Sequence, residues 1–142
     1  WWFDLTADAT LESDWILMQL WLHPPDAKGT WNPPNGERIQ RAAASILARQ
    51  LSDGGFAIYP GGPADVSASI KAYTALKLAG AGEDRLATLR ERILALGGLQ
   101  AANSYVKINL SLFGLFPREH TPSVPPEMIF AGKFLYEMSS WT

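Results

Sequence analysis

The sequence predicts an all-α fold on three observations. Apolar residues recur at spacings of three, four and seven in one segment after another, strand-type alternation is absent, and short turns rich in Gly and Pro separate the segments. Hydrophobic residues make up 47% of the 142 and charged residues 18%, which fits a globular unit with its own core. Each helix can be placed from its apolar pattern and its stop signals.

The first predicted helix covers residues 11–23 and ends at Pro24-Pro25. Its residues 15–22 are apolar on nearly every side, which is typical of a helix buried all round. The second begins after Asn35, a residue type favoured as an N-cap, and ends at 53–55, where Gly supplies the left-handed conformation of a helix end. One face of this second helix is apolar, and Arg residues occupy the other.

Four more helices follow: from residue 65 or 67 to 78, from 84 to 96, from about 101 to 113, and one that begins after Pro125-Pro126. The last has Glu127 in its first turn, where the helix dipole favours an anion. Six helices with short links permit antiparallel hairpins stacked side by side. This arrangement predicts a helical solenoid or a closed α/α toroid, that is, a helical-hairpin barrel.

Composition excludes several classes of function. The net charge is -2 and the 12 Lys and Arg residues are scattered, so we expect no nucleic-acid partner. Without cysteine there is neither a disulfide framework nor a thiolate metal site, and His23 and His120 lie in different turns, so we expect no metal. No apolar run reaches the roughly 20 residues of a transmembrane helix, and no signal peptide opens the chain. Because the chain starts at Trp1 and ends without a helix stop, we expect a piece of a longer protein.

Motifs for stand-alone catalysis are missing. The sequence has no Gly-rich phosphate loop, no nucleophile-elbow Ser and no His-Glu-x-x-His helix. Asp4, Asp8 and Glu12 recur at short spacing and could be taken for an acid cluster, but such spacing is more typical of a solvated helix entry. We therefore assign no catalytic residue, no metal ligand and no cofactor to this chain.

Residues 41–56 resemble the QW repeat of the triterpene cyclases. In that family a basic and a small residue open a helix, a Gln closes it, and Gly-x-Trp follows; here Arg41, Gln50, Gly54 and Phe56 stand at those positions. A Gln amide at a helix end can satisfy backbone groups of the next helix while an aromatic ring stacks over it. Phe56 replaces the Trp and so lacks the indole N–H. Trp1-Trp2 resembles the tail of a preceding repeat.

Further blocks extend the resemblance: residues 10–15, 58–65, 71–77, 125–127 and 136–141. In this order, and over nearly the whole chain, they are similar to the N-terminal part of bacterial squalene-hopene cyclases. The segment between Glu127 and Tyr136 is several residues shorter than the family pattern. The resemblance implies that residues 1–142 form one partial α/α barrel of a two-barrel terpenoid cyclase.

The resemblance also implies a chemistry. The family cyclises linear squalene to pentacyclic hopanoids, an isomerase reaction that begins with protonation and proceeds through a carbocation cascade without a metal or organic cofactor. Its proton donor is an Asp-x-Asp-Asp motif, which is absent here, so the acid must lie elsewhere and the chain alone is expected to be inactive. Aromatic faces stabilise the cation. By the same resemblance Trp141 lines the substrate cavity, and Asp14 and Asn103 belong to a polar network near its far end.

The expected partners are squalene or a related polyprenoid, the remaining C-terminal part of the same enzyme, and a membrane surface. The expected location is the cytoplasmic face of the bacterial membrane, as a peripheral or monotopic protein; a homodimer is compatible with this interpretation. An alternative is a non-catalytic α/α-toroid module that binds a protein or lipid. A third is a prenyltransferase β-type barrel, which requires Asp, Cys and His zinc ligands, and Cys is absent from this portion.

Overall fold

The computed structural model describes residues 7–121, and the chain divides into two compact units, residues 1–106 and 107–142. Within residues 7–121 the structure has only helices and turns, which confirms the all-α prediction. The helices are α1 (Ala9–Leu22), α2 (Gly36–Leu47), α3 (Val66–Leu78), α4 (Glu83–Ala95), α5 (Gly98–Ala101), α6 (Ser104–Leu112) and the short 3-10 helix η1 (Arg118–His120).

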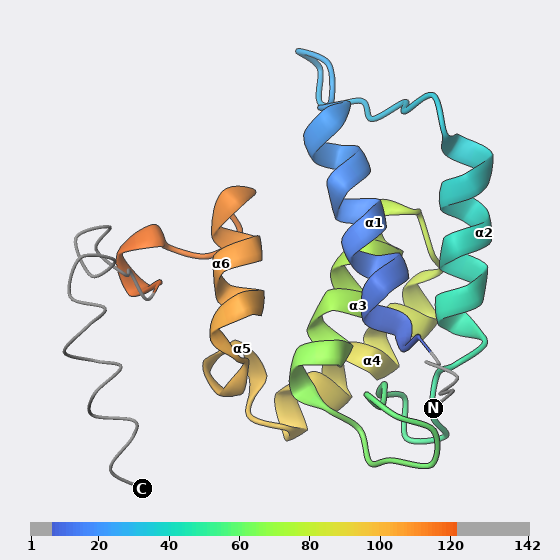
Figure 1. The fold of residues 1–142 in the computed structure, drawn as a ribbon, viewed down its shortest axis with the longest axis vertical. Coiled ribbons are helices and arrows are strands. Elements are labelled where there is room, and N and C mark those ends of the chain that lie inside the picture. Colours follow the sequence, from blue (N-terminus) through green and yellow to red (C-terminus); the bar gives the residue numbers. More distant parts are fainter. Residues whose placement is uncertain (1–6, 122–142) are drawn as a thin grey trace, which may run out of the picture. The chain divides into compact units, whose positions relative to one another are not determined.

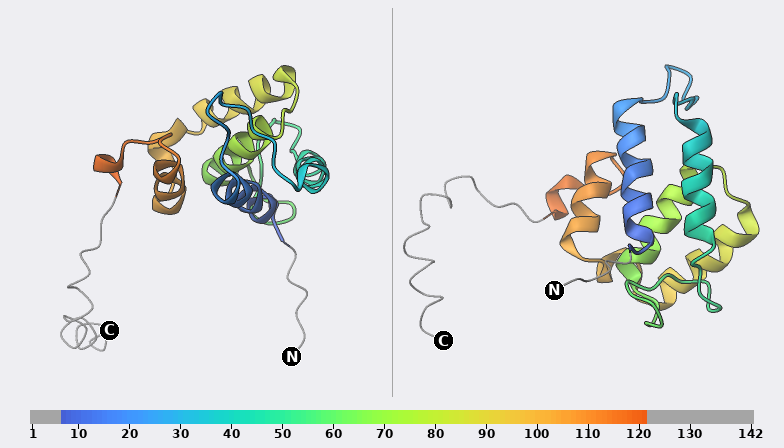
Figure 2. Two further views of the ribbon diagram at one scale, coloured as in Figure 1. Left: turned by 90° about the horizontal axis from the view of Figure 1, so that it is seen from above. Right: turned by 45° about the vertical axis from the view of Figure 1, so that its right-hand side comes forward.

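The first unit is built from two helical hairpins. α1 and α2 lie side by side and are joined at one end by a long loop, and α3 and α4 form the second pair (Figure 1). α1 packs against both α2 and α3, and α4 packs against α3, so the most extensive contact between the two hairpins is that of α1 with α3 (Figure 2). The core between them is formed by buried side chains that include Ile16, Ile46, Phe56, Leu76 and Leu89.

Two aspartates begin helices where the sequence places helix entries. The Asp8 carboxylate accepts a hydrogen bond from the backbone N–H of Thr10 at 3.0 Å, and that of Asp65 accepts from Ala68 N–H at 2.8 Å. Each carboxylate satisfies a backbone donor that has no partner within the helix. Asp8 is thus an N-cap, in agreement with its interpretation as a helix-entry residue; Asp4 lies outside the described residues.

The predicted end of the second helix is wrong. The sequence predicts helix up to residues 53–55, but α2 ends at Leu47. The N–H groups of residues 49 and 50 bond to carbonyls three residues back, at 3.0 and 3.2 Å, which tightens the last turn. The N–H of Leu51 then bonds to the carbonyl of Gly55 at 2.9 Å. This second bond turns the chain back on itself, so the residues before Gly54 form a loop.

The helix predicted for residues 101–113 is also wrong as a single element, because the structure divides it into α5 and α6. The break falls at Asn103, whose side-chain oxygen accepts from the N–H of Val106 at 3.0 Å and so caps α6. The N–H of Asn103 donates to the hydroxyl of Ser67 at 3.0 Å, outside its own segment. Because this N–H bonds to a side chain of α3, it does not bond to a carbonyl of α5, and the helix is interrupted here.

The expectation that the first helix is buried all round is contradicted as well. Four of its large apolar side chains are exposed: Leu11 (60%), Met18 (46%), Trp21 (61%) and Leu22 (57%). Within the first unit, α2 and α3 pack against the other side of α1. Apolar side chains therefore lie on two sides of α1, and the first unit buries one of these sides.

In the second unit, the described residues 107–121 contain the end of α6 and η1. The N–H of Leu115 bonds to the carbonyl of Leu110 at 2.9 Å, and the ring of Phe116 meets that of His120 edge-on, with centroids 6.5 Å apart. The helix predicted after Pro125-Pro126, with Glu127 in its first turn, lies outside the described residues. In the portion that is described, every helix is too short or too polar to cross a bilayer.

Candidate functional site

The loop of residues 50–56 follows α2 and contains the predicted repeat residues. The side-chain amide of Gln50 donates to the carbonyl of Gly54 at 2.9 Å, within the same loop. The sequence interpretation has this amide reaching the backbone of the next helix; the bond found here instead closes the turn that Gly54 makes. Gly54 has φ 84°, a conformation that L side chains rarely adopt.

Phe56 connects this loop to α3 through its backbone. Its side chain is fully buried, its N–H donates to the hydroxyl of Ser69 at 3.0 Å, and its carbonyl accepts from the N–H of Asp65 at 2.8 Å. Ser69 itself is completely buried in α3. The connection between hairpins that the sequence attributes to Gln50 is therefore made by the residue at the aromatic position.

The same loop packs closely against α4. A Cβ added to Gly54 would lie 2.7 Å from Cγ2 of Thr88, so only glycine fits against this helix without a shift. Next to it, the carboxylate of Asp53 forms an ion pair with the guanidinium of Arg92 at 2.8 Å. The 50–56 loop thus connects the end of α2 to both α3 and α4.

A second connection joins α1 to Arg49, two residues after the end of α2. The guanidinium of Arg49 binds the Glu12 carboxylate with both terminal nitrogens, at 2.6 and 3.1 Å, and also donates to the carbonyl of Ala7 at 3.2 Å. The hydroxyl of Ser45 donates to the same carboxylate at 3.1 Å. A guanidinium that binds a carboxylate through two nitrogens fixes the relative orientation of the two side chains better than a single hydrogen bond does. The sequence predicts a solvated helix-entry residue at Glu12, whereas the structure shows it as an ion-pair partner of Arg49.

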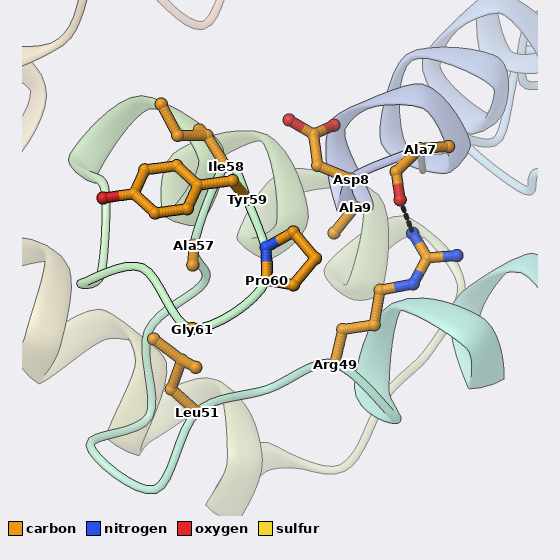
Figure 3. A pocket seen from close by; sticks show the side chains of 10 residues that line it. All are labelled: Ala7, Asp8, Ala9, Arg49, Leu51, Ala57, Ile58, Tyr59, Pro60 and Gly61. Carbon is orange, nitrogen blue, oxygen red and sulfur yellow. Dashed lines mark hydrogen bonds between the residues drawn. The ribbon is translucent and has the colours of Figure 1, made fainter. Parts of the chain in front are cut away.

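Beside this contact lies a pocket of about 360 Å³. Figure 3 shows Arg49 on one side of it and Ile58 and Tyr59 on the other, with Pro60 between them. The remaining lining residues are Ala7, Asp8, Ala9, Leu51, Ala57 and Gly61. Both terminal nitrogens of Arg49 are already bound to Glu12, Ser45 and a backbone carbonyl, so the pocket offers no uncommitted guanidinium to an anionic ligand.

Asp14, a candidate cavity residue, pairs with Lys71. The ammonium of Lys71 on α3 lies 2.7 Å from Oδ2 of Asp14 on α1, across 57 positions of sequence. The Lys71 side chain is only 14% exposed. The other carboxylate oxygen, Oδ1, is buried and has no hydrogen-bond partner among the residues that the structure describes. This ion pair links α1 to α3.

Asn103, the second candidate, is exposed and meets the same helix at Ser67. Ser67 and Lys71 are four residues apart, so they lie on one face of α3. Asp14 and Asn103 are thus brought to neighbouring turns of one helix, although each binds its own partner there. The side-chain oxygen of Asn103 also accepts from the N–H of Val106, so Asn103 is at the same time the residue that begins α6.

The sequence patterns predict no role for Lys71, Ser67 or Arg49. A signal for Lys71 existed, because this lysine stands between the apolar residues Ile70 and Ala72 in a helix with few charges. The partner could not be read from that pattern. Trp141, Trp1 and Trp2 lie outside the described residues. Within residues 7–121 no three metal-binding side chains come together.

Comparison with known proteins decides the family. The family model described as the squalene-hopene cyclase N-terminal domain matches residues 1–142. This chain belongs to the squalene-hopene cyclase family. The matching family model is that of the N-terminal domain of these cyclases, a domain with an α/α-toroid fold. The α/α-toroid prediction is therefore confirmed.

Individual relatives agree with this assignment. The squalene-hopene cyclase of Alicyclobacillus acidocaldarius is 33% identical over 99% of this chain, and that of Zymomonas mobilis is 38% identical over 91% of it. The squalene-hopene cyclase of Schizosaccharomyces japonicus is 34% identical over the full chain. The matched part is 22%, 19% and 21% of these three proteins, so the chain spans about a fifth of the length of the cyclases it matches.

Proposed function

We propose that this chain is the N-terminal part of an enzyme that cyclises linear squalene to pentacyclic hopanoids. The observation that carries the proposal is the family match over all 142 residues, together with relatives that are themselves named squalene-hopene cyclases. The reaction starts with protonation of a π-bond and continues as a carbocation cascade. Since the chain has no Asp-x-Asp-Asp, the acid belongs to the part of the enzyme outside it.

In this proposal the first unit contributes part of the wall of the substrate cavity. The exposed side of α1 carries Leu11, Met18 and Leu22. Asp14 belongs to the same side by its spacing of three and four residues from Leu11 and Met18. Binding sites for apolar molecules are largely apolar with a few placed polar groups, and this side of α1 has that character. Asn103 adds a second polar group near α3, and Trp141 supplies an aromatic face for the cation.

The test is conversion of squalene by the full-length protein that contains this chain. Purified protein is incubated with squalene in detergent, and the products are separated by gas chromatography with mass detection. Pentacyclic hydrocarbon or alcohol is the expected result, and it should disappear when the downstream acid motif is changed to amides. Unchanged squalene with a full-length protein that lacks an Asp-x-Asp-Asp would favour the non-catalytic module that binds a protein or lipid.

We further propose that the full-length protein acts at the cytoplasmic face of the bacterial membrane as a peripheral or monotopic protein. Squalene is a hydrocarbon and partitions into bilayers, so an enzyme that takes it up gains from contact with the membrane surface. Cell fractionation should place the protein in the membrane pellet and detergent should release it. Recovery in the supernatant at low salt would contradict this location, and sedimentation in detergent decides whether the protein is a homodimer.

A further inference from the structure

The ion pair between Asp14 and Lys71 lies within an apolar helix face. Asp14 follows Leu11 by three residues and precedes Met18 by four, so the three side chains share one side of α1. Leu11 and Met18 are both exposed in the first unit. A carboxylate is thus placed in the middle of an apolar surface, where a charged group is costly unless it is paired.

Lys71 supplies that pairing from the neighbouring helix. Its ammonium is 2.7 Å from Oδ2 of Asp14, and its side chain is largely withdrawn from solvent. Two opposite charges at this distance cancel each other's field at longer range, whereas removal of one leaves the other uncompensated in a partly buried place. The surface formed by Leu11, Asp14 and Met18 is therefore neutral only as long as Lys71 is present.

We propose that Lys71 is a positioning residue that keeps Asp14 from quenching the cationic intermediates of the reaction; this inference rests on the proposed function. An unpaired carboxylate beside a carbocation attracts it and can act as a base. The carboxylate oxygen takes a proton from a carbon adjacent to the cationic carbon, the electrons of that C–H bond become a new π-bond, and an incompletely cyclised alkene leaves. With Lys71 bound to Oδ2, the ion pair as a whole has no net charge, and the second carboxylate oxygen, Oδ1, is buried rather than exposed.

The pair predicts opposite effects for the two single variants. Lys71→Met leaves a negative charge on the wall, so cations are held and deprotonated early. Asp14→Asn leaves a positive charge, so cations are disfavoured along this wall and turnover falls. The double variant Asp14→Asn/Lys71→Met has no charge at either position and should behave more like the wild type than either single variant does.

The experiment measures product profiles of the full-length protein with squalene. Lys71→Met should raise the share of incompletely cyclised alkenes by about tenfold, Asp14→Asn should lower kcat by about tenfold with wild-type products, and the double variant should recover much of both losses. Lys71→Arg keeps the charge and should retain the wild-type profile. Lys77→Met, an exposed lysine of the same helix, is the matched control and should change neither quantity.

A thermal unfolding curve for each variant separates this role from a structural one. If the pair only stabilises the fold, the melting temperature falls in Lys71→Met while the product ratio stays as in the wild type, and the inference is overturned. A double variant that is worse than both single variants overturns it as well. Absence of conversion by the wild-type protein overturns the proposed function and this inference together, whereas conversion with an unaltered ratio in Lys71→Met overturns the inference alone.

Discussion

The hydroxyl of Ser69 accepts a hydrogen bond from the backbone N–H of Phe56 at 3.0 Å, and both residues are fully buried. This bond joins the loop after α2 to the first turn of α3. It satisfies a buried backbone donor that no helix or turn supplies with a partner. The two hairpins of the first unit are connected at this point, and the first two predictions concern its two residues.

Ser69→Ala should lower the free energy of unfolding by about 1–3 kcal/mol, because it leaves the N–H of Phe56 buried without an acceptor. Urea denaturation followed by circular dichroism gives the value. Ser52→Ala, in the same loop but exposed, is the control and should stay within about 0.5 kcal/mol of the wild type. Equal effects of the two changes would show that the hydrogen bond contributes little.

Phe56→Trp should destabilise the protein although it restores the residue of the QW pattern. Phe56 is fully buried, so the larger indole has to displace its neighbours at a cost of about 1–3 kcal/mol. Phe56→Ala removes the ring and should cost about 3–5 kcal/mol. Denaturation curves of the two variants test this order, and a Trp variant more stable than the wild type would mean that the site has room for the indole.

Gly54→Ala should be more harmful than Gly61→Ala. Both glycines have positive φ, 84° and 76°, so alanine at either position costs about 1–2 kcal/mol of backbone strain. At Gly54 the added Cβ also meets Thr88 at 2.7 Å, whereas at Gly61 it meets nothing within 4 Å. The difference between the two unfolding free energies isolates the contact with α4, and no difference would mean that Thr88 moves aside without cost.

The contact between Glu12 and Arg49 should contribute modestly and depend on salt. Its side chains are partly exposed, and such pairs are worth about 0.2–1 kcal/mol. A double-mutant cycle with Glu12→Gln and Arg49→Gln measures the coupling, which should shrink between low salt and about 1 M salt. Arg41→Gln on α2, where the guanidinium is exposed, serves as the control. A coupling that salt leaves unchanged would contradict an electrostatic origin.

Substitutions of Trp141 in the full-length protein should show whether its ring only packs in the core or also stabilises the cation. Trp141→Phe keeps a weaker π-face and should lower turnover moderately, while Trp141→Ala should also release prematurely quenched, less cyclised products. If the ring only packs, the Ala variant loses about 3–5 kcal/mol of stability and its product ratio is that of the wild type. Product analysis beside a melting curve for each variant decides between the two.

Local signals in the sequence predicted most of the helices. Pro24-Pro25 stops α1, Asp65 caps α3, and the Gly residues after α3 and α4 end those helices close to where the pattern places their ends. These features act within a few residues, through backbone geometry and a nearby side chain, so a single sequence contains the information. The family resemblance could also be predicted from the sequence, because several motif blocks occur along the chain in the order that the family has.

The tertiary structure decided how these elements use their polar groups. Asp14 and Lys71 are 57 residues apart, and their pairing depends on which faces of α1 and α3 meet. The break before α6 depends on a hydroxyl of Ser67 that accepts the N–H of Asn103. The sequence by itself determined an all-helical chain of the squalene-hopene cyclase family. Only the packing of its hairpins determined which carboxylate is neutralised and which loop connects them, because hydrogen bonds and ion pairs between distant residues depend on distances that no local pattern encodes.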